Sequence, residues 1–484
     1  MRRAGVLLHP TSLPGPYGIG DVGPSSRVWL DWMERAGLTV WQMLPLQPVH
    51  DIGSPYASPS AFAGEPLLLS PDDLCEDGWL LPTELPAVGD TSSVHWDNVR
   101  AAKGGALERA AERVRASIDM EAYATSADWL LDWALFSTLK HVHGGSWVSW
   151  PEPLRVREPS ALAEIRERYA PEVERALALQ WLFDQQWRRL REEAKRRGIA
   201  IWGDLPIFVD HDASDVWAAP ELFRLDERGL PTVVTGAPPD GFTPEGQRWG
   251  HPHYAIEAHR RTDHAWWRAR VRAILERVDT VRIDHFRGFE SAWEIPADLP
   301  DGSIGTWGEG MGAPLLTALR EVASDRPLPF VAEDLGVITD AVRALRDDYA
   351  LPGMAVLQFA FDGGWDNPYL PHRHRPHQVV YTGTHDNNTL DGWFAGLEPS
   401  ERSPVREYLS VGDDSACVAV MLAAWRSVAD HAIFPMQDLL RLDASARMNT
   451  PGTLLGNWSW RLTADALSPE LAQWVAYETR ISNR

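Results

Sequence analysis

The chain alternates short apolar runs with stretches of helical period, and this alternation restricts the fold more than any other feature. Each run is bounded by Gly, Pro or polar residues, which is typical of strands buried on both faces. The eight runs are GVLLH (5–9), TVWQMLPL (39–46), AIWGDLPIFV (200–209), TVRIDHF (280–286), PFVAEDLG (329–336), GMAVLQFAF (353–361), VVYTGTHD (379–386) and HAIFPMQD (431–438). Amphipathic stretches lie between most of them, which predicts an α/β fold: one (β/α)8 TIM barrel spanning residues 1–484.

Two connections are too long for a simple crossover. Residues 62–198 follow the second run and hold several helical segments, so we expect a mainly helical insertion there. Residues 210–262 follow the third run, and within them 236–254 is rich in Gly, Pro and aromatics and has no regular period. Long loops in compact domains are usually lids or binding loops, so we expect an active-site lid in this second insertion.

The charge and the cysteine content exclude several kinds of partner. With 46 Lys and Arg against 68 Asp and Glu, the net charge is −22, which repels nucleic-acid phosphates and anionic lipid headgroups. The longest apolar run, 416–425, is far below the ~20 residues of a membrane-spanning helix. Only Cys75 and Cys417 are present, which fits a reducing compartment. We therefore expect a cytoplasmic protein with no nucleic-acid and no membrane partner.

Tryptophan is the unusual part of the composition, with 24 Trp against 13 Phe and 10 Tyr. Flat indole faces suit the C–H faces of sugar rings. Most tryptophans in any large enzyme nevertheless pack in the core, so the surplus is compatible with carbohydrate binding without establishing it.

Acidic residues collect at the expected carboxyl ends of the strands, where (β/α)8 enzymes have their active sites. They are Asp204, Asp284, Glu333, Asp334, Asp386 and Asp438, with Asp212 in the loop after the third strand. Carboxylates crowded at one barrel mouth repel each other and cost stability. Their presence therefore indicates a catalytic carboxylate set or a metal site.

Two of these carboxylates have the arrangement that glycosidic chemistry requires. The two-residue strand period puts Arg282 and Asp284 on one face, where the guanidinium favours an ionised, nucleophilic carboxylate. The same period turns Glu333 into the mouth from the adjacent strand. One carboxylate can then attack the anomeric carbon while the other donates and later accepts a proton. Taken alone, each motif is more often a structural ion pair than a catalytic group.

Eight segments resemble a known family, the 4-alpha-glucanotransferases called amylomaltases or disproportionating enzymes, which are glycoside hydrolases related to the alpha-amylases. The segments are LLHPTSLPGPYGIGD (7–21), SPYASPSAFAG (54–64), GDLPIFV (203–209), PPDGFTPEGQRWGHPHY (238–254), VRIDHFRGF (281–289), VAEDLG (331–336), GTHDNNT (383–389) and ARMNTPG (446–452). The resemblance runs nearly end to end. It implies transfer of alpha-1,4-glucan segments from a donor to the 4-hydroxyl of an acceptor glucan or glucose, by a retaining double displacement, with alpha-1,4-glucans and maltooligosaccharides as partners and no metal or other cofactor.

The resemblance also implies roles for the three carboxylates. Asp284 would be the nucleophile, Glu333 the general acid/base, and Asp386 the group that holds the hydroxyls of the distorted sugar before the scissile bond. For its two proton transfers Glu333 needs a raised proton affinity, which we expect the nearby anions Asp284 and Asp386 to supply.

The remaining candidates bind substrate. The resemblance implies that Arg282, His285 and His385 line the same subsite, with Tyr56 and Asp212 nearby. In the lid loop, Gly241-Phe242 stands where the family usually has two adjacent aromatics, which leaves Phe242 as the main stacking platform and Trp249 as a further ring. Loss of one ring predicts weaker acceptor binding and a larger share of hydrolysis.

Three alternatives compete with this interpretation. A metal-dependent barrel hydrolase is suggested by His-x-His pairs at 141/143, 251/253 and 372/374, but none of these pairs directly closes a predicted strand. A non-catalytic glucan-binding protein has no need of a nucleophile paired with an acid. An alpha-glucan hydrolase shares every catalytic residue, so it is the alternative that the residues leave open.

Overall fold

A computed structural model describes residues 2–87, 89, 91–239, 244–324 and 327–484. The eight apolar runs form eight parallel strands in the order β10-β11-β12-β1-β2-β3-β6-β9, which confirms the predicted TIM barrel. The strands are β1 (Arg3–Leu7), β2 (Val40–Gln42), β3 (Ala200–Pro206), β6 (Thr280–Asp284), β9 (Phe330–Ala332), β10 (Gly353–Val356), β11 (Gln378–Tyr381) and β12 (His431–Pro435).

The barrel closes between β9 and β10 through a few specific contacts. The Ala332 N–H donates to the Pro352 carbonyl at 2.9 Å, and the Met354 N–H donates to the Asp334 carboxylate at 2.8 Å. Asp334 also pairs with Arg346 on α13 (Asp340–Asp348). Asp334 therefore holds two strands and a helix together, which is a structural role.

The two-residue strand period separates two apolar cores. Val331 belongs to the cluster inside the barrel, whereas its neighbour Ala332 packs outside with Val281 and Ile283 of β6. The other members of the inner cluster are Leu7, Val40, Leu44, Trp202, Met354, Val356, Val379, Tyr381, Ile433, Met448 and Trp458. Because each such buried side chain contributes about 1.5–3 kcal/mol, a register slip is costly. The expected facing of β6 and β9 is confirmed.

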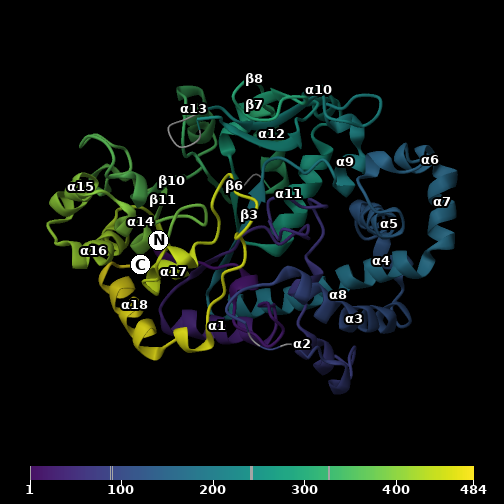
Figure 1. The fold of residues 1–484 in the computed structure, drawn as a ribbon, viewed down its shortest axis with the longest axis horizontal. Coiled ribbons are helices and arrows are strands. Elements are labelled where there is room, and N and C mark those ends of the chain that lie inside the picture. The colour runs from purple at the N-terminus through teal and green to yellow at the C-terminus, as the bar shows by residue number, and fades with distance from the viewer. Residues whose placement is uncertain (1, 88, 90, 240–243, 325–326) are drawn as a thin grey trace.

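Amphipathic helices cover the outside of the barrel, with α1 and α18 close together at the lower edge of the molecule (Figure 1). Among the described residues, seven tryptophans are at most 2% exposed, namely Trp29, Trp32, Trp41, Trp147, Trp217, Trp267 and Trp425, so much of the tryptophan surplus is core. The barrel helices are α1 (Pro24–Arg35), α11 (Ala265–Arg277), α12 (Gly312–Val322), α13, α14 (Leu390–Gly396), α15 (Pro399–Leu409), α16 (Asp413–Arg426), α17 (Met436–Leu439) and α18 (Pro469–Ile481).

Between β2 and β3 the chain forms a series of helices on one side of the barrel (Figure 1). They are α2 (Pro71–Glu76), α3 (Trp96–Arg115), α4 (Met120–Ala124), α5 (Asp128–His143), α6 (Glu152–Arg155), α7 (Pro159–Arg168) and α8 (Ala170–Arg196). The long helix α8 packs against α3, α5 and β3, so it joins this helical segment to the barrel wall.

A second sheet, antiparallel and four-stranded, lies beside the barrel mouth in the order β5-β4-β7-β8. Its strands are β4 (Val233–Ala237), β5 (Gln247–Pro252), β7 (Ser291–Pro296) and β8 (Thr306–Glu309), flanked by α9 (Ser214–Ala218) and α10 (Ile256–Arg261). The expectation that 236–254 lacks regular structure was therefore wrong at its ends. The strands are short and contain Gly236, Gly250 and Pro252, which hides the alternation that marks a strand. No helix among the described residues is long and apolar enough to cross a membrane.

Candidate active site

Asp284 ends β6 and is held by Arg282 of the same strand. Arg282 Nη2 lies 2.9 Å from Asp284 Oδ1, and its Nη1 lies 2.7 Å from Asp204 Oδ2 on β3. Arg282 and Asp204 are almost fully buried, whereas the Asp284 side chain is 27% exposed at the mouth. The buried pair fixes the guanidinium, because breaking such a pair leaves an uncompensated charge. Asp284 is thus an oriented carboxylate that a ligand can reach.

Glu333 follows β9 and is held by backbone donors. Its Oε2 accepts from the His285 N–H and its Oε1 from the Leu335 N–H, both at 2.8 Å. His285 has φ of 51°, a left-handed conformation that is uncommon outside glycine and is often found at functional sites. This turn directs the His285 N–H toward Glu333.

Burial, the largest cause, and the neighbouring Asp284 charge together raise the pKa of Glu333 to about 7, against the opposing effects of Arg282 and of the two backbone hydrogen bonds. The expectation that Asp284 and Asp386 would be the source of the raised proton affinity was therefore wrong in emphasis, since desolvation is the largest cause. A carboxyl group that titrates near neutral pH can act as an acid and then as a base.

Asp386 lies in the loop after β11 and is held by its neighbours. Asn449 Nδ2 donates to Asp386 Oδ1 at 2.6 Å, and Arg447 donates to the Asp386 carbonyl at 2.6 Å. His385 Nε2 lies 3.3 Å from the other carboxylate oxygen. The Asp386 side chain is 40% exposed, so it too faces a space that a ligand can enter.

Tyr56 brings the carboxylates into one group. Its hydroxyl donates to Asp204 Oδ2 at 2.8 Å. Burial raises the pKa of Tyr56 well above its ordinary value, and the charges of Asp204, Asp284 and Asp386 all add to the rise. Its ring stacks on His385 with centroids 5.1 Å apart and planes within 10°. Asp284 and Asp386, 102 positions apart in the sequence, therefore lie around one phenol ring.

The second sheet contributes residues to the same mouth. The Trp249 ring meets the His285 ring edge-on at 4.8 Å. Next to it, the pKa of His251 is lowered by burial, while the Asp210 and Asp284 charges oppose the decrease. His251 is thus close enough to Asp284 to interact with it. Its sequence context, a His-x-His pair in a Pro-rich loop, had suggested only a weak metal motif.

One predicted binding residue, Asp212, stands apart from this group. Both oxygens of Asp212 have partners in the helical segment, namely Lys140 Nζ at 2.6 Å and the Trp147 N–H at 3.1 Å. Contact of Asp212 with a sugar stays a prediction that competes with these bonds. Phe242 and Gly241 lie outside the described residues.

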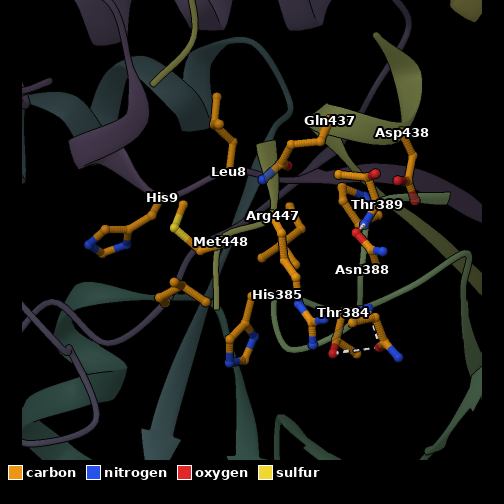
Figure 2. A pocket seen from close by; sticks show the side chains of 14 residues that line it. Leu8, His9, Thr384, His385, Asn388, Thr389, Gln437, Asp438, Arg447 and Met448 are labelled. Atoms are coloured by element: carbon orange, nitrogen blue, oxygen red, sulfur yellow. Dashed lines mark hydrogen bonds between the residues drawn. The ribbon is translucent and has the colours of Figure 1, made fainter. Parts of the chain in front are cut away.

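A pocket beside His385 contains residues that sequence reasoning missed (Figure 2). It is lined by Leu7, Leu8, His9, Leu44, Thr384, His385, Asn387, Asn388, Thr389, Pro435, Gln437, Asp438, Arg447 and Met448. Burial and the neighbouring His385 lower the pKa of His9 to about 3, so its imidazole is neutral. His9 and Arg447 belong to the motifs 7–21 and 446–452, which is the signal that could have identified them.

The His-x-His pairs have other partners. His253 Nδ1 lies 2.9 Å from Glu294, His372 contacts the Tyr408 hydroxyl, and His374 contacts Ser427 and Tyr369. Within the described ranges, no three His, Cys, Asp or Glu side chains form a group that could hold a metal ion. His253, His372 and His374 thus have partners within the protein.

Fold and site together define a (β/α)8 enzyme with a carboxylate set suited to glycosidic bonds. The sequence profile described as 4-alpha-glucanotransferase matches residues 8–467. A 4-alpha-glucanotransferase from Thermus thermophilus is 46% identical over 488 residues, covering 97% of this chain and 96% of the relative. A chloroplastic/amyloplastic 4-alpha-glucanotransferase from Arabidopsis thaliana is 44% identical over 471 residues, covering 95% of this chain and 81% of the relative. The chain belongs to the 4-alpha-glucanotransferase family, and it is an enzyme of that class.

A solved structure agrees with this assignment. The amylomaltase from Streptococcus agalactiae, in complex with acarbose, superposes with a TM-score of 0.96 at 32% identity, and the match covers 100% of both chains. The amylomaltase from Corynebacterium glutamicum superposes with a TM-score of 0.80 at 18% identity, which supports the fold.

Proposed function

We propose that this chain moves alpha-1,4-glucan segments to the 4-hydroxyl of an acceptor glucan or glucose by a retaining double displacement. The observation that carries the proposal is the pairing of an oriented, accessible Asp284 carboxylate with a Glu333 carboxyl group whose pKa is about 7. Asp284 attacks the anomeric carbon, and the bond from this carbon to the leaving oxygen breaks as Glu333 protonates that oxygen. The result is a glycosyl ester on Asp284.

In the second step the ionised Glu333 accepts the proton of an acceptor hydroxyl. The acceptor oxygen attacks the anomeric carbon, the ester bond breaks, and Asp284 leaves as a carboxylate. Two inversions at one carbon return the original configuration. Water in place of the sugar hydroxyl gives hydrolysis, which is the alternative outcome on the same residues.

The remaining residues hold the sugar. We propose that Asp386 accepts hydrogen bonds from its hydroxyls, because Asn449 and His385 orient the carboxylate and leave it exposed. Arg282, His285 and His385 would line the subsite, with Tyr56 and Asp212 nearby. Phe242 and Trp249 would offer rings on which the acceptor can stack. Two carboxyl groups are sufficient for this chemistry, so we propose no cofactor.

Product analysis after incubation with maltotriose alone separates transfer from hydrolysis. We expect a ladder of glucans longer and shorter than three units, with an Asp284→Ala variant as the inactive control. Glucose and maltose with nothing longer would establish the alpha-glucan hydrolase instead.

The organisation and location are part of the same proposal. We propose one catalytic barrel over residues 1–484, with insertions at 62–198 and 210–262. The free Cys75 and Cys417 support a reducing compartment such as the cytoplasm. The net charge of −22 supports neutral glucans over nucleic acid or anionic membranes as partners.

A further inference from the structure

Three aromatic rings line up on the surface beyond β10. Trp365 is 56% exposed, and its ring lies nearly parallel to that of Tyr408 on α15, with centroids 6.2 Å apart and planes within 20°. The His372 ring continues the series, 5.7 Å from Tyr408 at 28°. Single exposed apolar side chains are common, but a built series of rings is not. We call Trp365, Tyr408 and His372 the aromatic platform.

The platform is held by the fold. The buried Phe361 packs edge-on against Tyr408 at 5.9 Å, and the Tyr408 hydroxyl accepts from the His372 backbone N–H at 3.1 Å. Asn367 stabilises the loop that contains Trp365. Its Nδ2 donates to the Phe359 carbonyl at 2.7 Å and to Asp362 at 3.0 Å. Rings fixed in advance lose little freedom on binding, which favours affinity.

We propose that the aromatic platform is a second binding site for alpha-glucan chains, separate from the catalytic site. Trp365 is stacked on Tyr408 on one side and remains more than half exposed, so its indole offers an apolar surface on which the C–H face of a neutral glucan unit can stack. The exposed carboxylates Asp362 and Asp366 flank Trp365 in the sequence and supply acceptors for hydroxyl groups. The same carboxylates disfavour a second copy as occupant, because self-association would bring like charges together.

The platform lies on the catalytic side of the barrel. Its loop follows β10, which neighbours β9, and loops at the carboxyl ends of barrel strands share one face. Tyr369, four residues after Trp365, is close to the catalytic group: burial, Asp334 and Glu333 together raise its pKa to about 12. A long chain bound at the platform is therefore kept near the carboxylates at a high effective concentration. This inference rests on the proposed function for the choice of glucan as ligand.

The test compares long and short substrates. Trp365→Ala should weaken retardation in native gels containing amylopectin and raise the KM for amylopectin about 3- to 10-fold, as loss of one ring stack predicts. Its rate on maltotriose should stay within about twofold of wild type. Trp365→Phe should restore part of the binding. Tyr477→Ala, which removes an exposed aromatic on α18, should change neither readout.

The proposal of a second glucan site would be overturned if Trp365→Ala showed the retardation and the kinetics of the wild type. It would also be overturned if the gel did not retard the wild type at all. An altered oligomeric state in size-exclusion chromatography with unchanged glucan binding would also overturn it and indicate self-association. Failure of the proposed function is distinguishable, because it appears as a wild type that forms no longer glucans from maltotriose.

Discussion

Arg282 and Asp284 lie two residues apart on β6, and their side chains meet at 2.9 Å on one face of the strand. The strand period dictates that they share a face. The position of the guanidinium is fixed from outside the strand, because Asp204 of β3 binds its other nitrogen at 2.7 Å. Asp284 is therefore aimed into the mouth by two neighbouring strands.

Replacing Asp284 with Asn should remove transfer by several orders of magnitude and leave the fold intact, because a neutral amide cannot form the ester. The ladder formed from maltotriose measures the loss, and circular dichroism checks the fold. Mass spectrometry must exclude deamidation back to Asp. If the folded variant kept more than about a tenth of the wild-type rate, Asp284 would not be the nucleophile.

The loss of glycosylation rate in Glu333→Gln should depend on the leaving group of the substrate. A maltosyl fluoride needs no proton on departure, so its glycosylation rate should fall much less than the rate with maltotriose. Stopped-flow release of fluoride and product analysis with maltotriose give the two rates. Equal losses on both substrates would contradict the acid role.

The pH profile of the wild type should follow Glu333. Its pKa of about 7 means that the protonated acid is lost as the pH rises through this value, so kcat/KM for maltotriose should fall above about pH 7. Fluoride release from maltosyl fluoride should lack this alkaline decrease. A maltotriose profile that stays flat to pH 9 would mean that Glu333 does not supply the proton.

The buried carboxyl group of Asp438 should make the stability of the fold depend on pH. Burial raises its pKa to about 7, while its two oxygens accept from Thr382 and from the Leu390 N–H. The folded pKa lies above the unfolded value of about 4, so stability is lost as the pH rises from about 4 to about 7. Asp438→Asn keeps the shape and both partners.

The difference in the free energy of unfolding between the Asn variant and wild type should therefore shift in favour of the variant by about 3 kcal/mol or less as the pH rises from 5 to 8. Urea unfolding at both values measures the difference. The exposed Asp414→Asn is the matched control and should show no such change. A gain that is equal at both pH values would contradict the assignment to Asp438.

The barrel and its carboxylates could be predicted because their signals are local. Eight apolar runs specify strands buried on both faces, and the period of two in 281–284 and 330–333 specifies which side chains enter the mouth. Asp284 and Glu333 follow directly from that period. The second sheet could not be predicted this way, since β5 contains Gly250 and Pro252 and gains its order from pairing with β4.

The electrostatics of the site depend on long-range contacts that no local pattern encodes. Tyr56 reaches Asp204 across 148 positions of sequence, and Asn449 reaches Asp386 across 63. The proton affinity of Glu333 is set mainly by burial in the assembled mouth, which requires the packed structure. For the same reason His251 emerges as a neighbour of Asp284 only after the second sheet has formed.

The most direct test of the account is to locate the covalent intermediate. In Glu333→Gln treated with a maltosyl fluoride, the C–F bond breaks without a proton donor and the ester then persists, because no base activates the acceptor. Peptide mass spectrometry should find one maltosyl unit on the peptide that contains Asp284. An adduct on Asp204 or Asp386, or no adduct while fluoride is still released, would contradict the double displacement through Asp284.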